Sequence, residues 1–221
     1  MIAFDKLVDY KSDFKVDTGK FRVLPSQSTV EEVAKKLESL NHKATIVKDE
    51  AAALALIKTL IPNGASVMNA GSVSLSEIGW IDYLKGSHPW KNLHHDILEE
   101  KDPAKQAELR RHSMSADYFV SSVSAVSKDG AIYVCDASGS RVGGFSFAAK
   151  NIILVVGTHK IVENDKDGHS RVWDFCLPSE SVRAHVAYKV PGSQVQNMLR
   201  IANSNVPGRI HVIFVPKMLG Y

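Results

Sequence analysis

The fold of this chain is decided by residues 116–161, ADYFVSSVSAVSKDGAIYVCDASGSRVGGFSFAAKNIILVVGTHKI. Three apolar runs typical of β-strands lie in this stretch, at residues 118–123, 131–135 and 152–156. The last run, IILVV, is apolar at every position, as in a strand that is covered on both faces of a parallel sheet. The stretch therefore predicts an α/β protein with a mostly parallel sheet.

Strand runs and helical patterns alternate through the rest of the chain, as in βαβ units. Further strands are predicted at residues 44–47, 65–68 and 210–215, and helices at residues 28–40, 49–60, 74–86, 102–112, 165–176 and 194–202. Capping boxes, with a glutamate three residues after a serine, are expected to open two of these helices, at Ser28 and Ser74. The Asp129-Gly130 pair is a strong turn signal, which leaves one local hairpin open.

No linker rich in proline, glycine and serine divides the 221 residues. We therefore expect one α/β domain at residues 29–221, preceded by a docking segment at residues 1–28. The first residues lack the apolar core of a signal peptide, and no apolar run approaches the roughly 18 residues of a membrane span. A cytoplasmic protein without a membrane partner is expected. Lysine and arginine are scattered rather than gathered in a stripe, which argues against a nucleic-acid partner.

Small, polar and basic residues follow the predicted strands, and the carboxyl ends of parallel strands meet at one edge of a sheet. The candidate ligand-binding residues are Asn69, Gly71, Ser72, Ser74, Ser122, Gly139, Ser140, Arg141, Gly157, His159 and Lys160. Arginine offers a fixed fork of donors for a carboxylate or phosphate, and the amides that open a helix also favour anions. The pattern predicts a site for a small anionic metabolite. The alternatives are that Ser74 only caps a helix and that Arg141 only pairs with Asp136.

Glu77 and Asp136 are the candidate general bases, since each is a carboxylate near the predicted site. Glu77 also has a sufficient role in the expected capping box. No metal site is predicted, because the His94-His95-Asp96 run has no third ligand at a recognisable spacing. The two cysteines form no CxxC pair, and Cys135 closes an apolar strand, so we expect no metal cofactor and no disulfide framework.

Several short motifs in order resemble the LUD domain family of lactate-utilisation proteins. They are SLSEIG at residues 74–79, AD at 116–117, VSS at 120–122, GSRV at 139–142, VVG at 155–157, HKIV at 159–162 and LGY at 219–221. The resemblance runs from about Thr29 to the end. It implies a Rossmann-like sheet of the sugar-phosphate isomerase and CoA-transferase-like fold, whose isomerases hold phosphate on a strand-loop-helix and use an acidic base and a lysine.

The family resemblance also implies a role in the oxidation of lactate to pyruvate, as a subunit or accessory protein working with redox partner subunits. Many relatives carry a cluster of four cysteines shortly before the last strand, but residues 188–202 here contain none. No iron–sulfur cofactor is therefore expected. An isomerase-like or transferase-like enzyme that uses Glu77 or Asp136 as its base is the alternative, and assembly into a homo-oligomer is left open.

Overall fold

The computed structural model describes residues 18–221, with side chains from Gly19 onward, so most of the predicted docking segment lies outside the described residues. The first described helix is α2 (Thr18–Phe21). Phe21 is buried, and the centroid of its ring lies 5.9 Å from that of the Phe175 ring. Among residues 18–221, no helix has the length and apolar character needed to cross a bilayer.

The central sheet has six strands, and all five of its pairings are parallel, which confirms the predicted sheet. Their spatial order is β1 (Lys43–Ile46), β10 (Ile210–Val215), β7 (Asn151–Gly157), β4 (Tyr118–Ser121), β2 (Ser66–Asn69) and β3 (Lys91–Asn92). The arrangement is Rossmann-like, since helices cover the sheet and every strand runs the same way. The loops after β2, β4 and β7 therefore leave the same edge.

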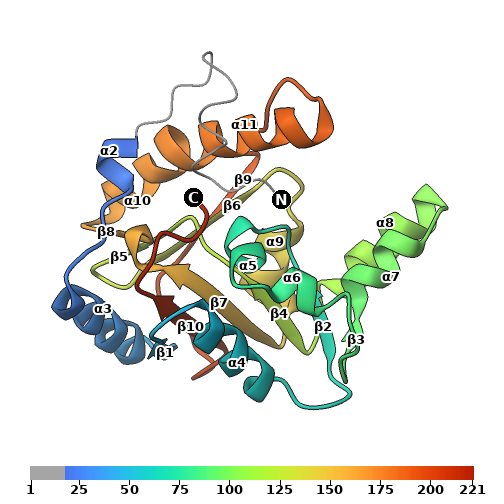
Figure 1. Cartoon of the computed structure of the whole chain (residues 1–221), viewed down its shortest axis with the longest axis horizontal. Coiled ribbons are helices and arrows are strands. Elements are labelled where there is room, and N and C mark those ends of the chain that lie inside the picture. The colour runs from blue at the N-terminus through green and yellow to red at the C-terminus, as the bar shows by residue number, and fades with distance from the viewer. Residues whose placement is uncertain (1–17) are drawn as a thin grey trace.

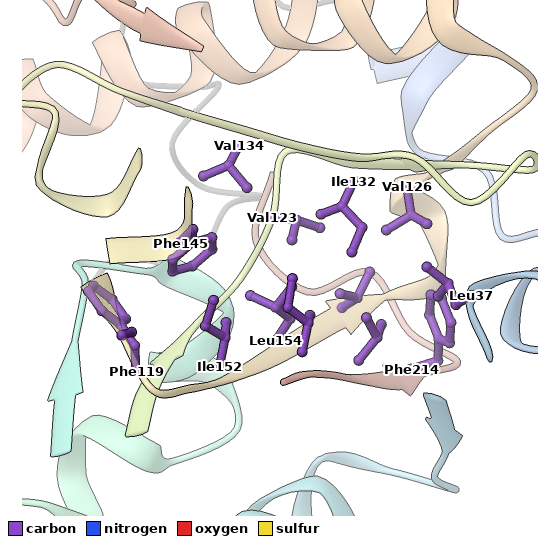
Figure 2. Packing of buried hydrophobic residues seen from close by; sticks show 14 of the residues in the cluster. Leu37, Phe119, Val123, Val126, Ile132, Val134, Phe145, Ile152, Leu154 and Phe214 are labelled. Atoms are coloured by element: carbon purple, nitrogen blue, oxygen red, sulfur yellow. The ribbon is translucent and has the colours of Figure 1, made fainter. Parts of the chain in front are cut away.

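Strand β7 forms the centre of the core. Because side chains alternate across a strand, Ile152 and Leu154 pack on one face of the sheet, and Ile153 and Val155 pack on the other. The first face meets a second layer that includes Ile132 and other apolar residues, as Figure 2 shows. Cover on both faces explains why the run is apolar at every position.

That second layer is a smaller sheet of four strands: β8 (Ile161–Val162), β5 (Ala125–Ser127), β6 (Ile132–Asp136) and β9 (Asn197–Ile201). Strands β5 and β6 form the antiparallel hairpin that Asp129-Gly130 allows, and Gly130 has a φ of +86°. The expectation that residues 131–135 join the parallel sheet is wrong. The predicted helix at residues 194–202 is also wrong, because β9 pairs antiparallel with β6 there.

Helices enclose both sheets, with α10 and α11 at the top of Figure 1 and α4 near the bottom. They are α3 (Gln27–Ser39), α4 (Glu50–Leu60), α5 (Val73–Glu77), α6 (Trp80–Tyr83), α7 (Leu93–Glu99), α8 (Pro103–Ser113), α9 (Ser140–Gly143), α10 (Asp165–Arg171) and α11 (Leu177–Tyr188). Two π-helical turns, η1 (Gly144–Ala148) and η3 (Val172–Cys176), and one 3-10 turn, η2 (Thr158–Lys160), complete the chain.

Helix starts differ from the predicted capping boxes. Ser26, not Ser28, caps α3 by accepting a hydrogen bond from Thr29 N at 3.2 Å. Ser72, not Ser74, caps α5 through Leu75 N. Pro178 does not end the helical segment that starts at residue 165, because it occupies the first turn of α11, where a missing N–H costs nothing.

Candidate functional site

A cavity of about 250 Å³ lies at the carboxyl ends of the central strands. Seven of the predicted site residues line it: Gly71, Ser72, Ser74, Ser122, Asp136, Arg141 and Lys160. The positions of five of them follow from the sheet order, since β2, β4 and β7 are neighbours that end at the same edge. Asp136 and Arg141 come from the second sheet instead, because Asp136 ends β6 and Arg141 lies in the short helix α9 that follows it.

Lys160 lines this cavity and is buried, with 2% of its surface exposed. Its Nζ donates hydrogen bonds to Ser74 Oγ at 3.1 Å, to Ser122 Oγ at 3.1 Å and to Val123 O at 3.2 Å. Burial, and after it the charge of Arg171, lowers the pKa of Lys160 to about 7. At neutral pH, a substantial fraction of this amine is therefore uncharged.

Arg141 lines the cavity and contacts the loop that follows β2. Its guanidinium donates to Gly71 O at 2.6 Å and to Cys135 O at 3.5 Å. Nε of Arg141 is buried and has no hydrogen-bond partner among the described residues. A buried donor without a partner is costly, so the site has an unused hydrogen bond to offer an anion.

Asp136 supports the backbone of its own loop instead of pairing with Arg141. Its carboxylate accepts hydrogen bonds from Gly139 N at 2.6 Å, Val142 N at 2.9 Å and Asn197 Nδ2 at 3.2 Å. These bonds hold α9 in the orientation that points Arg141 at the cavity. Asp136 is therefore a positioning group in this structure, with both oxygens already engaged.

Helix α5 and the segment after β10 bind each other beside the cavity. Ser74 Oγ donates to Leu219 O at 2.9 Å, and a carboxylate oxygen of Glu77 accepts from Gly220 N at 2.7 Å. The Ser74–Glu77 capping box is thus replaced by two long-range contacts. Because α5 has only five residues, its dipole adds little to the site.

Six predicted residues lie outside the cavity lining: Asn69, Glu77, Gly139, Ser140, Gly157 and His159. Gly157 has a packing role, since a Cβ there would meet Leu219 N and Lys217 O at 2.7 Å. His159 is buried, and burial holds its pKa well below the ordinary value, so its imidazole is neutral. Gly139 supplies a left-handed turn, with φ of +81°.

Four further lining residues, which are not among the candidates from the sequence, form what we call the α11 wall. They are Glu180, Arg183 and Tyr188 of α11, together with Tyr221. Arg183 makes two hydrogen bonds to the Glu180 carboxylate, at 2.7 and 2.6 Å, and Tyr221 donates to the same group. The available signal is the Glu180–Arg183 spacing, which suits one face of a helix, but the predicted helix at residues 165–176 ends before it.

Two cysteines lie near Arg171 behind this wall. The guanidinium of Arg171 is fully buried, donates to Ser124 O and approaches Cys176 Sγ at 3.2 Å. Cys135 Sγ lies 3.3 Å from Ser124 Oγ, and burial raises the pKa of this thiol to about 11. Cys135 is therefore a protonated thiol rather than a nucleophile at neutral pH. Among residues 18–221, no three His, Cys, Asp or Glu side chains gather as metal ligands.

This geometry defines an α/β protein with a small cationic cavity at the carboxyl edge of a parallel sheet. The LUD domain family model matches residues 30–215, and the chain therefore belongs to the LUD domain family, as its motifs indicate. That family is known from lactate-utilisation proteins.

Comparison with solved structures agrees on the fold. One similar structure is a crystal structure of a DUF162 family protein from Deinococcus radiodurans, with a TM-score of 0.50 and 14% sequence identity. The alignment covers 87% of this chain and 99% of that chain. At this identity the similarity shows the fold alone. Comparison with curated proteins gave no match.

Proposed function

We propose that the protein binds a small anionic metabolite in this cavity and serves lactate utilisation as a subunit or accessory protein. The observation that supports binding is the presence of Arg141 and Lys160 in one cavity, although they follow strands of different sheets. Lactate oxidation removes two electrons, and redox partner subunits would accept them. The lactate role rests on family membership.

The charge balance of the cavity favours an anion. Of its two acidic side chains, Glu180 is neutralised by Arg183 and Asp136 is engaged by three donors. Arg141 bonds only to backbone carbonyl oxygens, so its charge has no carboxylate partner among the described residues. A carboxylate or phosphate would supply the missing countercharge and accept the free Nε–H.

An isomerase-like or transferase-like enzyme is the second candidate. Asp136 supports it because this carboxylate lines the cavity. As a base it would first have to release Gly139 N and Val142 N, which both donate to it. Glu77 would have to release Gly220 N and lies outside the lining. We therefore prefer binding as the primary role.

Calorimetric titration of the full chain with L-lactate, pyruvate and a sugar phosphate tests the proposal. Arg141→Gln should weaken binding of the true ligand roughly tenfold to a hundredfold, since it removes a charge-assisted contact. Arg111→Gln, at an exposed position on α8, is the matched control and should bind as the wild type does. Equal affinity of the Arg141→Gln and Arg111→Gln proteins for every ligand that binds would contradict the proposal.

A further inference from the structure

The environment of Lys160 suits a nucleophilic amine better than a cation that only attracts anions. Among residues 18–221, no carboxylate forms a salt bridge with its Nζ, although the side chain is buried. The three acceptors around Nζ are two hydroxyls and one carbonyl, all from residues that line the cavity. A lysine that only bound anions would be better placed at the exposed rim, where its charge costs less.

The charged and titratable groups that act on Lys160 come from every element around it. They are Arg171 of α10, Arg141 of α9, Cys176 of η3 and Glu77 of α5, with His159 next to it in η2. The two arginines lower the pKa of Lys160, whereas Glu77 and Cys176 raise it. Burial is the largest effect and acts with the two arginines, so the pKa falls to about 7. The neutral amine needed for a nucleophile is therefore present at physiological pH.

We propose that Lys160 forms an imine with the carbonyl carbon of a small 2-oxo acid, while Arg141 holds the carboxylate of the same molecule. This proposal rests on the proposed function, because it assigns the anion to a carboxylic acid with an adjacent carbonyl. The two groups match Arg141 and Lys160, the two cationic lining residues that have no salt bridge among the described residues, whereas Arg183 is paired with Glu180. A simple hydroxy acid would use Arg141 alone.

The step is balanced without an oxidant or a reductant. The lone pair of the neutral Nζ forms a bond to the carbonyl carbon, and one of the two Nζ protons passes to the carbonyl oxygen, which becomes the hydroxyl of a carbinolamine. The second Nζ proton then passes to that hydroxyl, which leaves as water when the carbon–nitrogen double bond forms. The amine and the ketone therefore yield an imine and one water.

Ser122 is placed to assist the transfer of the proton. The hydroxyl of Ser74 is committed to Leu219 O at 2.9 Å, whereas that of Ser122 has Lys160 as its only hydrogen-bond partner among the described residues. A hydroxyl can rotate to donate or to accept. Ser122 can therefore donate to the neutral amine or to the oxygen of the carbinolamine, and we assign it as a positioning residue.

Borohydride trapping of the full chain tests this assignment. The protein is incubated with glyoxylate or pyruvate, reduced, and examined by intact mass and peptide mapping. We expect one reduced adduct per chain, on Lys160, with a yield that rises through about pH 7. At pH 7 its neutral fraction should exceed that of an ordinary lysine by roughly a thousandfold. L-lactate, which lacks the carbonyl, should leave no adduct.

Four variants test the proposal further, and one of them is a control. Lys160→Arg should abolish the adduct, while Lys85→Arg, at an exposed position, should not change it. Arg141→Gln should reduce trapping of glyoxylate but not of an uncharged aldehyde such as propanal. Ser122→Ala should slow the trapping of glyoxylate on Lys160.

Peptide mapping of the wild-type protein decides the outcome even if the Lys160 variant does not fold. Adducts found only on surface lysines, or no adduct at all, would overturn the imine. If calorimetry still detects binding of lactate or pyruvate in that case, the proposed function stands and only the covalent step is wrong. If neither binding nor trapping occurs, both proposals fail.

Discussion

The Nζ atom of Lys160 lies 3.1 Å from Ser74 Oγ, although 86 residues separate the two in sequence. Ser122 Oγ lies at the same distance from this nitrogen. Lys160, Ser74 and Ser122 follow β7, β2 and β4, which are three adjacent strands of the sheet. One buried amine therefore connects residues that follow three adjacent strands at the carboxyl edge of the sheet.

The first prediction concerns the pH dependence of stability. The pKa of Lys160 is about 7 in the folded protein, against an ordinary value of 10.5. Between these values the unfolded chain binds more protons, so the free energy of unfolding contributed by this group rises with pH. Relative to Lys160→Met, the wild type should gain on the order of 1 kcal/mol per pH unit between about pH 7 and pH 10.

Urea unfolding of both proteins at several pH values measures this difference, and Lys85→Met serves as the control for loss of an exposed lysine. Below about pH 7 the difference should be constant, since both folded and unfolded chains are then protonated at Lys160. Parallel pH profiles for wild type and Lys160→Met across the whole range would show that this lysine titrates normally.

The second prediction concerns Asp136. Asp136→Ala removes the acceptor of Gly139 N and Val142 N and should cost about 1–3 kcal/mol of unfolding free energy, because these donors lose their partner. Ligand affinity should also fall, since α9 positions Arg141. Asp82→Ala removes an exposed pair with Lys85, which solvent screens, and should cost much less stability than Asp136→Ala. Equal losses of stability in denaturant unfolding would contradict the role of Asp136.

The third prediction compares two glycines in left-handed backbone. Gly220 has φ of +61°, and a Cβ there would lie 2.7 Å from Ser74 Oγ. Gly64 has φ of +81° and open space around it. Both alanine variants carry the cost of left-handed backbone, but Gly220→Ala should lose roughly 1–3 kcal/mol more from overpacking.

Gly220→Ala should also displace Ser74 and weaken ligand binding, whereas Gly64→Ala should leave affinity unchanged. Thermal unfolding and calorimetry of the two variants report these effects separately. A Gly220→Ala protein with the melting temperature and affinity of Gly64→Ala would refute the contact between Gly220 and Ser74.

The fourth prediction concerns thiol chemistry. Burial raises the pKa of Cys135 to about 11, so at pH 8 its thiolate fraction is small. Native Cys135 should react with iodoacetamide about a hundredfold more slowly than the same residue in urea. Peptide mapping of the alkylated protein over time measures both rates, and urea-unfolded protein is the internal reference. Rapid alkylation in the native state would mean that the thiol is activated.

The parallel sheet could be predicted because its central strand has a distinctive pattern. Apolar residues at every position of β7 require cover on both faces, and only a few architectures provide it. The convergence of Ser74, Ser122 and Lys160 follows from the same reasoning, since each comes after a strand of one parallel sheet.

The predictions for β9 and for Ser74 were wrong because contacts between residues far apart in sequence outweigh the local preference for a helix or a helix cap. The residues of β9 have apolar positions that suit a helix as well as a strand, and only pairing with β6, such as Met198 beside Cys135, decides between them. Ser74 resembled a helix cap because its true partner, Leu219 O, lies 145 residues away. Such long-range contacts leave no periodic signal in a single sequence.

The position of β10 in the central sheet has a consequence for synthesis of the protein. This strand is inserted between β1 and β7, as Figure 1 shows, although among the strands of residues 18–221 it is synthesised last. Until it arrives, β1 has no neighbour and β7 presents an open apolar edge. Exposed edges of this kind attract other chains, so a nascent chain that lacks β10 should be the species most prone to aggregate and to engage chaperones.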